Sequence, residues 1–253
     1  MYSGTTACVA LLRQNKLCEL VLVIAMRFTS CVNTYLHLCH VFIAMHNLDI
    51  GNAGDSRAVL ARRTTKNGPI PSFRKKNEST KPNSSAPKLM TIPLSIDQNP
   101  DSSGEKERII GKGGYVSPPP EPGLTARVWL DAEYTQIGLA MARSIGDHAV
   151  KDVGVIADPV VTVHEINEED EFVILATDGV WEFIKSGDAV NIVSEHLYGE
   201  HANNDDSNIC ASKACEALIK AAMEKWHEYE GDYRDDITAI VVRLKDIFMW
   251  KHH

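Results

Sequence analysis

Two apolar runs stand out in the pattern of hydrophobic and polar positions. Residues 171–177, EFVILAT, have the composition of a buried strand, and residues 233–244, YRDDITAIVVRL, contain a second such run. An aspartate lies at one end of each run: Asp178 directly follows the first, and Asp235 comes just before the second. The pattern therefore predicts two core strands, each with a carboxylate at its end.

The rest of the chain alternates between strand-like and helix-like periodicity. Short apolar or alternating segments predict strands at residues 6–12, 56–61, 91–96 and 160–165. Helical spacing predicts helices at residues 102–112, 187–197 and 206–229, the first of them capped by Asp101 or Ser102 and ended by Gly113. This order suits a sandwich with flanking helices, so we expect sheets and helices in separate layers.

The positions of Asp178 and Asp235 raise the question of a metal site. If the two strands are antiparallel, the end of one and the start of the other fall on the same edge of the sheet. Two carboxylates held close together repel, unless one is protonated or a cation lies between them. Magnesium or manganese suits such oxygen ligands, and hydrolysis or phosphoryl transfer is their usual chemistry. Ordinary turn chemistry remains the alternative, because Asp-Gly and Asp-Asp are also common in loops.

Composition narrows the class of protein without adding chemistry. The chain of 253 residues is 44% hydrophobic and 24% charged, as is usual for globular domains. Its net charge of -8 argues against nucleic acid as a partner. The six cysteines form no paired framework, which favours reduced thiols in an intracellular protein of the cytoplasm or nucleus.

Six sequence blocks together carry a family resemblance. They are SGTTA at 3–7, GNAGDSRAVLARR at 51–63, EKERIIGKGGYV at 105–116, GLAMARSIGDHAVK at 138–151, ATDGVW at 176–181 and RDDITAIVV at 234–242. In content and order the chain resembles metal-dependent serine/threonine phosphatases of the protein phosphatase 2C family. The resemblance implies an α+β fold, an antiparallel β-sandwich flanked by helix pairs. It also implies hydrolysis of phosphoserine and phosphothreonine in a phosphorylated protein substrate, with two or more Mg²⁺ or Mn²⁺ ions.

The resemblance also assigns individual residues. Asp178 matches the metal aspartate of the family's strand-Asp-Gly motif, and Asp235 matches the first residue of an Asp-Asn pair, with Asp236 in place of the asparagine. Asp55 matches an aspartate that helps to bind a third, weaker metal, although it could equally brace its own turn. Arg143 and Asp147 belong to a segment near the family's active-site cleft, where a structural salt bridge or turn contact is the alternative.

Some motifs of the family do not occur in this sequence. Similar phosphatases carry a phosphate-binding arginine, an acidic pair and an Asp-Gly-His-Gly segment before the SGTTA block, and none of these is present. We therefore interpret residues 1–246 as a partial catalytic domain, with no catalytic residue assigned, and residues 247–253 as a tail. The expected consequence is impaired hydrolysis. The alternative is an inactive, phosphatase-like binding or regulatory module.

Two segments interrupt the resemblance. Residues 18–49 form an apolar insert, for which we consider a membrane helix, a helix packed on the sheet, and a translated intron or misjoined gene model. A spanning helix is disfavoured because Arg27, Asn33 and two histidines lie along it. Residues 65–88 are polar and basic and predict a flexible loop, which could otherwise dock an acidic partner. Oligomeric state is not predicted.

Overall fold

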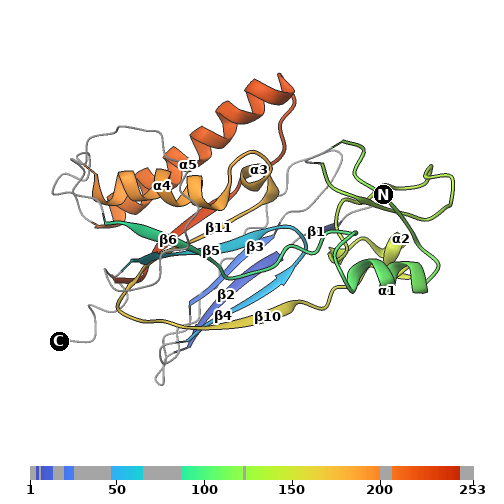
Figure 1. The fold of residues 1–253 in the computed structure, drawn as a ribbon, viewed down its shortest axis with the longest axis horizontal. Coiled ribbons are helices and arrows are strands. Elements are labelled where there is room, and N and C mark those ends of the chain that lie inside the picture. The colour runs from blue at the N-terminus through green and yellow to red at the C-terminus, as the bar shows by residue number, and fades with distance from the viewer. Residues whose placement is uncertain are drawn as a thin grey trace, which may run out of the picture.

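Two four-stranded antiparallel sheets form the centre of the molecule (Figure 1). The computed structural model describes residues 4–5, 7–13, 20–25, 47–64, 87–121, 124–199 and 207–245. The first sheet has the order β10 (Val160–Glu165), β4 (Asn47–Ala53), β2 (Ala7–Arg13) and β3 (Leu20–Ala25). The second has the order β12 (Ala239–Arg243), β11 (Asp170–Ala176), β5 (Arg57–Arg63) and β6 (Leu89–Pro93).

The side chains of strand β11 pack into two core layers, one on each face of the second sheet. All seven of its residues are buried. Phe172, Ile174 and Ala176 pack in one apolar cluster with the helices, whereas Val173 and Leu175 pack in a second cluster with residues of the other sheet. Side chains of a strand point alternately to its two faces, so a continuous apolar run is what a strand covered on both sides requires.

Three helices form the layer on the second sheet (Figure 1). They are α3 (Asp178–Trp181), α4 (Ser186–Tyr198) and α5 (Ser207–Glu230). Their buried residues, among them Val193 and Leu218, belong to the same cluster as Val59 of β5. The predicted α+β class with antiparallel sheets is thereby confirmed, and the described helical layer covers the second sheet.

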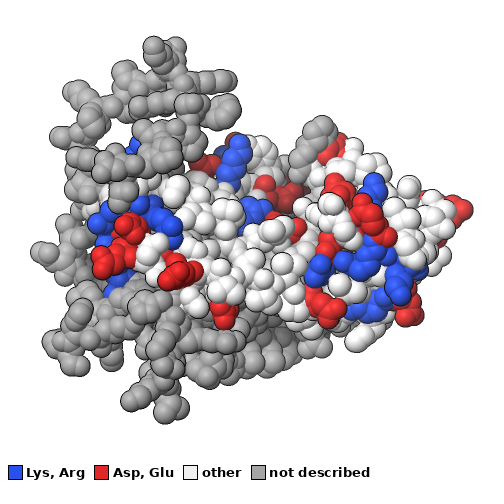
Figure 2. All heavy atoms as spheres, turned by 60° about the horizontal axis from the view of Figure 1, so that its bottom comes forward, with Lys and Arg blue, Asp and Glu red and all other residues white. Residues whose placement is uncertain are grey.

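A smaller lobe lies to the right in Figure 1. It contains the helices α1 (Glu105–Gly111) and α2 (His148–Lys151), the strand pair β7 (Tyr115–Ser117) and β8 (Arg127–Trp129), and the pair β1 (Gly4–Thr5) and β9 (Ile145–Gly146). Its own core consists of Ile109, Val128, Ala142, Val150 and Val155. On the face seen in Figure 2, charged residues of both signs gather at the left and over the smaller lobe at the right, with further charged residues at the upper centre.

The start of α1 differs from the prediction. The helix begins at Glu105 after Gly104, whose φ of 84° lies in the left-handed region, rather than after Asp101 or Ser102. The carbonyl of Ser102 accepts hydrogen bonds from the backbone N–H groups of Glu105 and Lys106, so Ser102 belongs to the turn before the helix. The Glu107 carboxylate caps the helix by accepting from the Gly104 N–H at 2.6 Å.

Part of the predicted insert, residues 18–49, is sheet. Leu20–Ala25 is the edge strand β3 and pairs with β2, so neither helical interpretation of the insert holds for this stretch. Its sequence, LVLVIA, is rich in the branched residues that favour strands. Strand β4 already begins at Asn47. Residues 26–46, residues 65–86 of the predicted basic loop, and the tail lie outside the described residues. No helix in the described part of the chain combines the length and apolar character that crossing a bilayer needs.

A buried carboxylate ties the two sheets together at one end. The fully buried side chain of Asp170, on β11, accepts hydrogen bonds from Arg62 of β5 at 2.6 Å and from the Asn167 N–H at 3.1 Å. The oxygen that accepts from Asn167, Oδ2, also lies 2.9 Å from Nε2 of His164, on β10 of the first sheet. Burial alone would raise the pKa of Asp170, but the hydrogen bonds from His164 and Arg62 outweigh it and lower the pKa.

Replacing Asp170 by Asn should therefore destabilise the protein in a pH-dependent way. We expect a loss of about 3 kcal/mol at pH 7, because the substitution leaves Arg62 without its buried partner. A lowered pKa stabilises the folded state above the pKa of the unfolded aspartate and loses that effect as the pH falls through the folded value. The difference between parent and variant should thus shrink below about pH 4.

Urea unfolding of both proteins between pH 3 and pH 7 measures this difference. Exposed Glu168→Gln, two residues away, is the matched control and should change stability little. A loss for Asp170→Asn that is the same at every pH would contradict the ion-pair explanation.

Candidate functional site

The ends of β11 and β12 meet at one edge of the second sheet. The two strands are antiparallel, as predicted, with Ala176 opposite Ala239. Beyond the ladder, the Thr177 N–H donates to the Thr238 carbonyl at 3.1 Å, and the Thr238 N–H donates to the Thr177 hydroxyl at 3.1 Å. These contacts hold the segment before Asp178 against the segment after Asp235.

Gly179 allows the two segments to touch. Asp178 is the first residue of α3, and its carboxylate accepts from the Gly179 N–H at 2.9 Å. A Cβ at position 179 would lie 2.9 Å from the carbonyl carbon of Asp236 and closer still to its oxygen. The glycine of the Asp-Gly pair is thus required for close backbone approach, which goes beyond ordinary turn chemistry.

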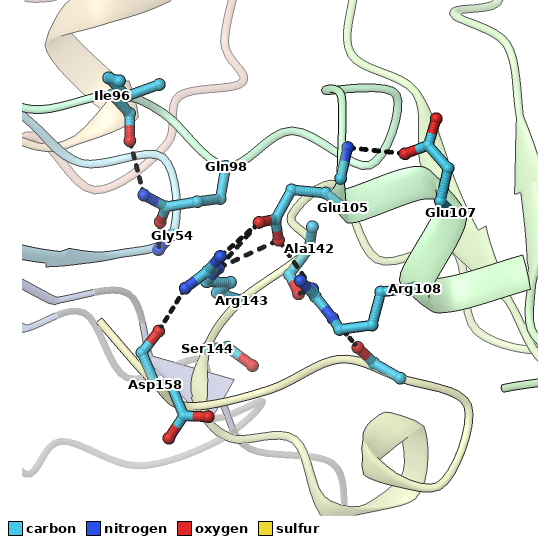
Figure 3. A network of polar contacts seen from close by, with 12 residues as sticks. Gly54, Ile96, Gln98, Glu105, Glu107, Arg108, Ala142, Arg143, Ser144 and Asp158 are labelled. Atoms are coloured by element: carbon cyan, nitrogen blue, oxygen red, sulfur yellow. Dashed lines mark hydrogen bonds and ion pairs between the residues drawn. The ribbon is translucent and has the colours of Figure 1, made fainter. Parts of the chain in front are cut away.

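Asp55 reaches the same region from the turn between β4 and β5. The backbone of that turn is fixed by Gln98, whose side-chain oxygen accepts from the Gly54 N–H at 2.6 Å (Figure 3). The buried Asn52 side chain donates to the carbonyls of Gly54 at 3.2 Å and Ile96 at 3.1 Å. One carboxylate oxygen of Asp55, Oδ1, is buried with no hydrogen-bond partner among the described residues.

The three aspartates influence one another electrostatically. Burial and the nearby charge of Asp235 raise the pKa of Asp178 to about 7. Burial, followed by the charge of Asp178, raises the pKa of Asp55 well above its usual range, and burial raises that of Asp235. Carboxylates with such raised pKa values lack sufficient compensation by hydrogen bonds or cationic side chains. The site therefore favours either protons or an added cation.

Hard divalent cations fit this set of donors. Carboxylate oxygens are the ligands that Mg²⁺ and Mn²⁺ prefer, and the unpartnered Oδ1 of Asp55 is an acceptor without a protein donor. Within the described ranges, however, no three His, Cys, Asp or Glu side chains are grouped so as to hold a metal by themselves. The described residues thus provide the kind of ligand atom that these ions prefer. They need not provide every ligand, because Mg²⁺ keeps several waters in such sites.

An ion pair not anticipated from the sequence borders the site. Arg57, two residues after Asp55, contacts the Asp97 carboxylate at 2.6 Å and donates to the Ser186 hydroxyl at 3.1 Å. Its guanidinium also lies 5.3 Å from the centre of the Trp181 ring. Arg57 thereby connects β5, the segment after β6 and the start of α4. The GDSR block contains Arg57, but a partner 40 positions away leaves no local signal.

Arg143 has the structural role that was the alternative interpretation. Its guanidinium contacts the Glu105 carboxylate at 2.6 Å and donates to the Asp158 carbonyl at 2.8 Å (Figure 3). Arg108 binds the other oxygen of Glu105 at 2.7 Å. Burial would raise the pKa of Glu105, but hydrogen bonds from Arg143 and Arg108 lower it overall. Asp147 has a left-handed backbone, with φ 46°, and directly precedes α2.

Comparison with known proteins identifies the family. Residues 39–228 match the sequence model of protein phosphatase 2C. The chain belongs to the protein phosphatase 2C family. Members of this family generally depend on magnesium or manganese, in agreement with the type of donor at this site. The matched region starts inside the predicted insert, which ends at residue 49.

Several plant proteins of the protein phosphatase 2C family are related to this chain in sequence. It is 41% identical over 200 residues to "Probable protein phosphatase 2C 14" of Oryza sativa subsp. japonica, covering 79% of this chain and 32% of the relative. It is 35% identical over 193 residues to "Probable protein phosphatase 2C 34" of Arabidopsis thaliana, covering 76% of this chain and 44% of the relative. The chain thus spans less than half of either relative.

A solved structure shares the fold. The serine-threonine phosphatase 2C from Toxoplasma gondii superposes with a TM-score of 0.60 and 21% sequence identity, covering 89% of this chain and 58% of that one. At this identity the likeness concerns the fold alone. It agrees with the sandwich inferred from the six sequence blocks.

Replacing Gly179 by Ala tests the backbone contact under Asp178. The added methyl group would overlap the Asp236 carbonyl, so we expect a loss of about 2 kcal/mol in the free energy of unfolding. Gly187→Ala is the matched control, because a Cβ there meets only the Thr91 hydroxyl at an ordinary 3.9 Å. Chemical denaturation of the two variants provides the comparison, and equal stabilities would contradict the tight approach.

Proposed function

We propose metal-dependent hydrolysis of phosphoserine and phosphothreonine in other proteins as the function, with the activity of these 253 residues alone impaired. Asp178 and Asp235 are the proposed ligands of Mg²⁺ or Mn²⁺, and Asp55 is the proposed ligand of a further ion. The observation that supports this most is that the charges of Asp178 and Asp235 act on Asp55 and that of Asp235 acts on Asp178, with one oxygen of Asp55 buried and unpartnered among the described residues. The ions, when bound, supply Lewis-acid chemistry at a phosphate ester.

The residues around the aspartates have defined parts in this proposal. Gly179 brings the Asp178 segment against the segment that carries Asp235, and Gln98 fixes the turn before Asp55. Arg57 neutralises Asp97, whose charge would otherwise act more strongly on Asp55. These contacts orient the carboxylates before any cation arrives, which lowers the cost of assembling the site.

Cellular context is part of the same proposal. The partner is a phosphorylated protein, and the compartment is intracellular, either cytoplasmic or nuclear. Residues 1–246 form the catalytic-domain portion of the chain. The related plant proteins named above are both described as probable protein phosphatases 2C. This chain covers only part of each relative. Hydrolysis of phosphoproteins by the whole protein is therefore a proposal.

Manganese should stabilise the parent chain by binding at Asp55, Asp178 and Asp235, which we call the acidic site. With a dissociation constant near 1 mM, 5 mM Mn²⁺ adds about 1 kcal/mol, which corresponds to roughly 3 °C in Tm for a domain of this size. We expect Asp235→Ala to lose most of this shift, because it removes a ligand. Exposed Asp152→Asn, in the small lobe, should keep it. Equal shifts in parent and Asp235→Ala would exclude Asp235 from the site.

A second candidate, the non-catalytic phosphatase-like module, is favoured by one observation: the described residues hold no complete metal-ligand group. An activity assay separates the candidates. With millimolar manganese, we expect the 253-residue chain to hydrolyse para-nitrophenyl phosphate barely faster than Asp178→Asn, because its sequence lacks the family's Asp-Gly-His-Gly segment. A clear manganese-dependent rate that Asp178→Asn abolishes would refute the impairment and exclude the non-catalytic module.

A further inference from the structure

Four aromatic side chains form a connected cluster beside the acidic site. Phe183 stacks on Tyr229 with ring centres 5.0 Å apart and packs edge-on against Trp226 at 4.8 Å. Tyr233 packs edge-on against the same Trp226 at 5.9 Å. We call Phe183, Trp226, Tyr229 and Tyr233 the aromatic surface. It joins the segment after α3 to the end of α5 and the loop that follows.

The aromatic surface is anchored to the residues that carry the acidic site. The indole N–H of Trp226 donates to the Gly179 carbonyl at 2.7 Å, directly after Asp178. Tyr233 precedes Asp235 by two residues in the same loop. Figure 1 shows α3 lying beside α5, as this hydrogen bond requires. A ligand that contacts these rings would therefore lie close to the proposed metal ligands.

The rings differ in what they contribute to folding. Trp226 is only 7% exposed and belongs to the core, whereas Tyr229 is 59% exposed and Tyr233 is 63% exposed. Two tyrosines that leave more than half of their surface in water gain little from burial. Such rings next to a site are typical of binding surfaces, because they offer contact area with little loss of side-chain entropy.

The surface already holds one cation. Nζ of Lys225 lies 5.4 Å from the centre of the Tyr229 ring, within the range of a cation–π interaction. The same ammonium group contacts the Glu228 carboxylate at 2.7 Å. An aromatic face and a carboxylate thus act together on a positive charge at this position, which identifies the chemistry that the surface accepts.

The charges around the rings have the matching sign. Residues 224–236 contain six Asp or Glu residues against one Lys and one Arg. Glu182 directly precedes Phe183 and adds a further carboxylate next to the rings. Together these groups favour positively charged ligands over neutral or acidic ones.

We propose that the aromatic surface binds an arginine or lysine side chain of the phosphoprotein substrate, close in sequence to the phosphorylated residue. This inference rests on the proposed function for the nature of the partner. The basic side chain packs against the exposed parts of Tyr229 and Tyr233 and is paired by the surrounding carboxylates. The contact selects substrates by their flanking sequence and directs the phosphate toward the neighbouring acidic site.

Peptide binding to the full chain tests the inference without requiring turnover. The probes are fluorescein-labelled phosphoserine peptides that carry either arginine or its neutral analogue citrulline beside the phosphoserine, together with their unphosphorylated forms. Fluorescence anisotropy should give about fivefold tighter binding for arginine than for citrulline, with and without the phosphate. The unphosphorylated pair separates this inference from the proposed function, because it needs neither metal nor phosphate.

Variants assign the preference to the rings. Replacing Tyr229 and Tyr233 together by leucine should abolish the preference for arginine, whereas replacing both by phenylalanine should retain it. Tyr115→Leu, at a tyrosine in β7 that is 41% exposed, is the matched control and should bind like the parent. Equal binding of arginine and citrulline peptides by the parent chain would refute the proposal, whether or not the variants fold. So would an undiminished preference in the double leucine variant.

Discussion

The arrangement of the acidic site depends on one close backbone contact. Gly179 packs against the Asp236 carbonyl, and only a residue without a Cβ fits there. On either side of this contact lie Asp178 and Asp235, so their carboxylates share one edge of the second sheet. The same short segment also supplies the Gly179 carbonyl that accepts from Trp226. This single contact thus helps to position both carboxylates and the aromatic surface.

The carboxyl groups named above fall into two classes, those with a lowered pKa and those with a raised pKa. Asp170 and Glu105 are buried beside arginines, and the hydrogen bonds from those arginines lower the pKa values of both carboxyls. Asp55, Asp178 and Asp235 have raised pKa values instead, because burial is not offset by a basic partner. Burial also raises the pKa of the neighbouring Glu182, so the described carboxyls with raised pKa values gather around this one site. Uncompensated carboxylates of this kind are expected where a cation is to be bound.

The sequence predicted most of the elements, and where it failed the reasons are physical. Strand β10 has the predicted bounds, because its alternating pattern reports directly on the two faces of a strand. The start of α1 was missed, because Ser102 uses its carbonyl in a turn that resembles a cap in sequence. The pairing of Arg57 with Asp97 could not be predicted, because it depends on how the chain folds over 40 residues. Likewise, Asp-Gly suggested a turn, whereas the steric need for Gly179 appears only when Asp236 is in place.

The hydrogen bond from Trp226 to Gly179 connects the proposed substrate-binding tyrosines with the proposed metal ligand Asp178. Trp226 supports both exposed tyrosines, either directly or through Phe183, and it is bonded to the residue after Asp178. A substrate side chain bound to the tyrosines, as proposed, would therefore contact a support that also holds the segment of the proposed metal ligand Asp178. Rigid packing transmits such contacts over short distances. Flanking sequence could thus influence the orientation of Asp178 as well as affinity, without a separate conformational switch.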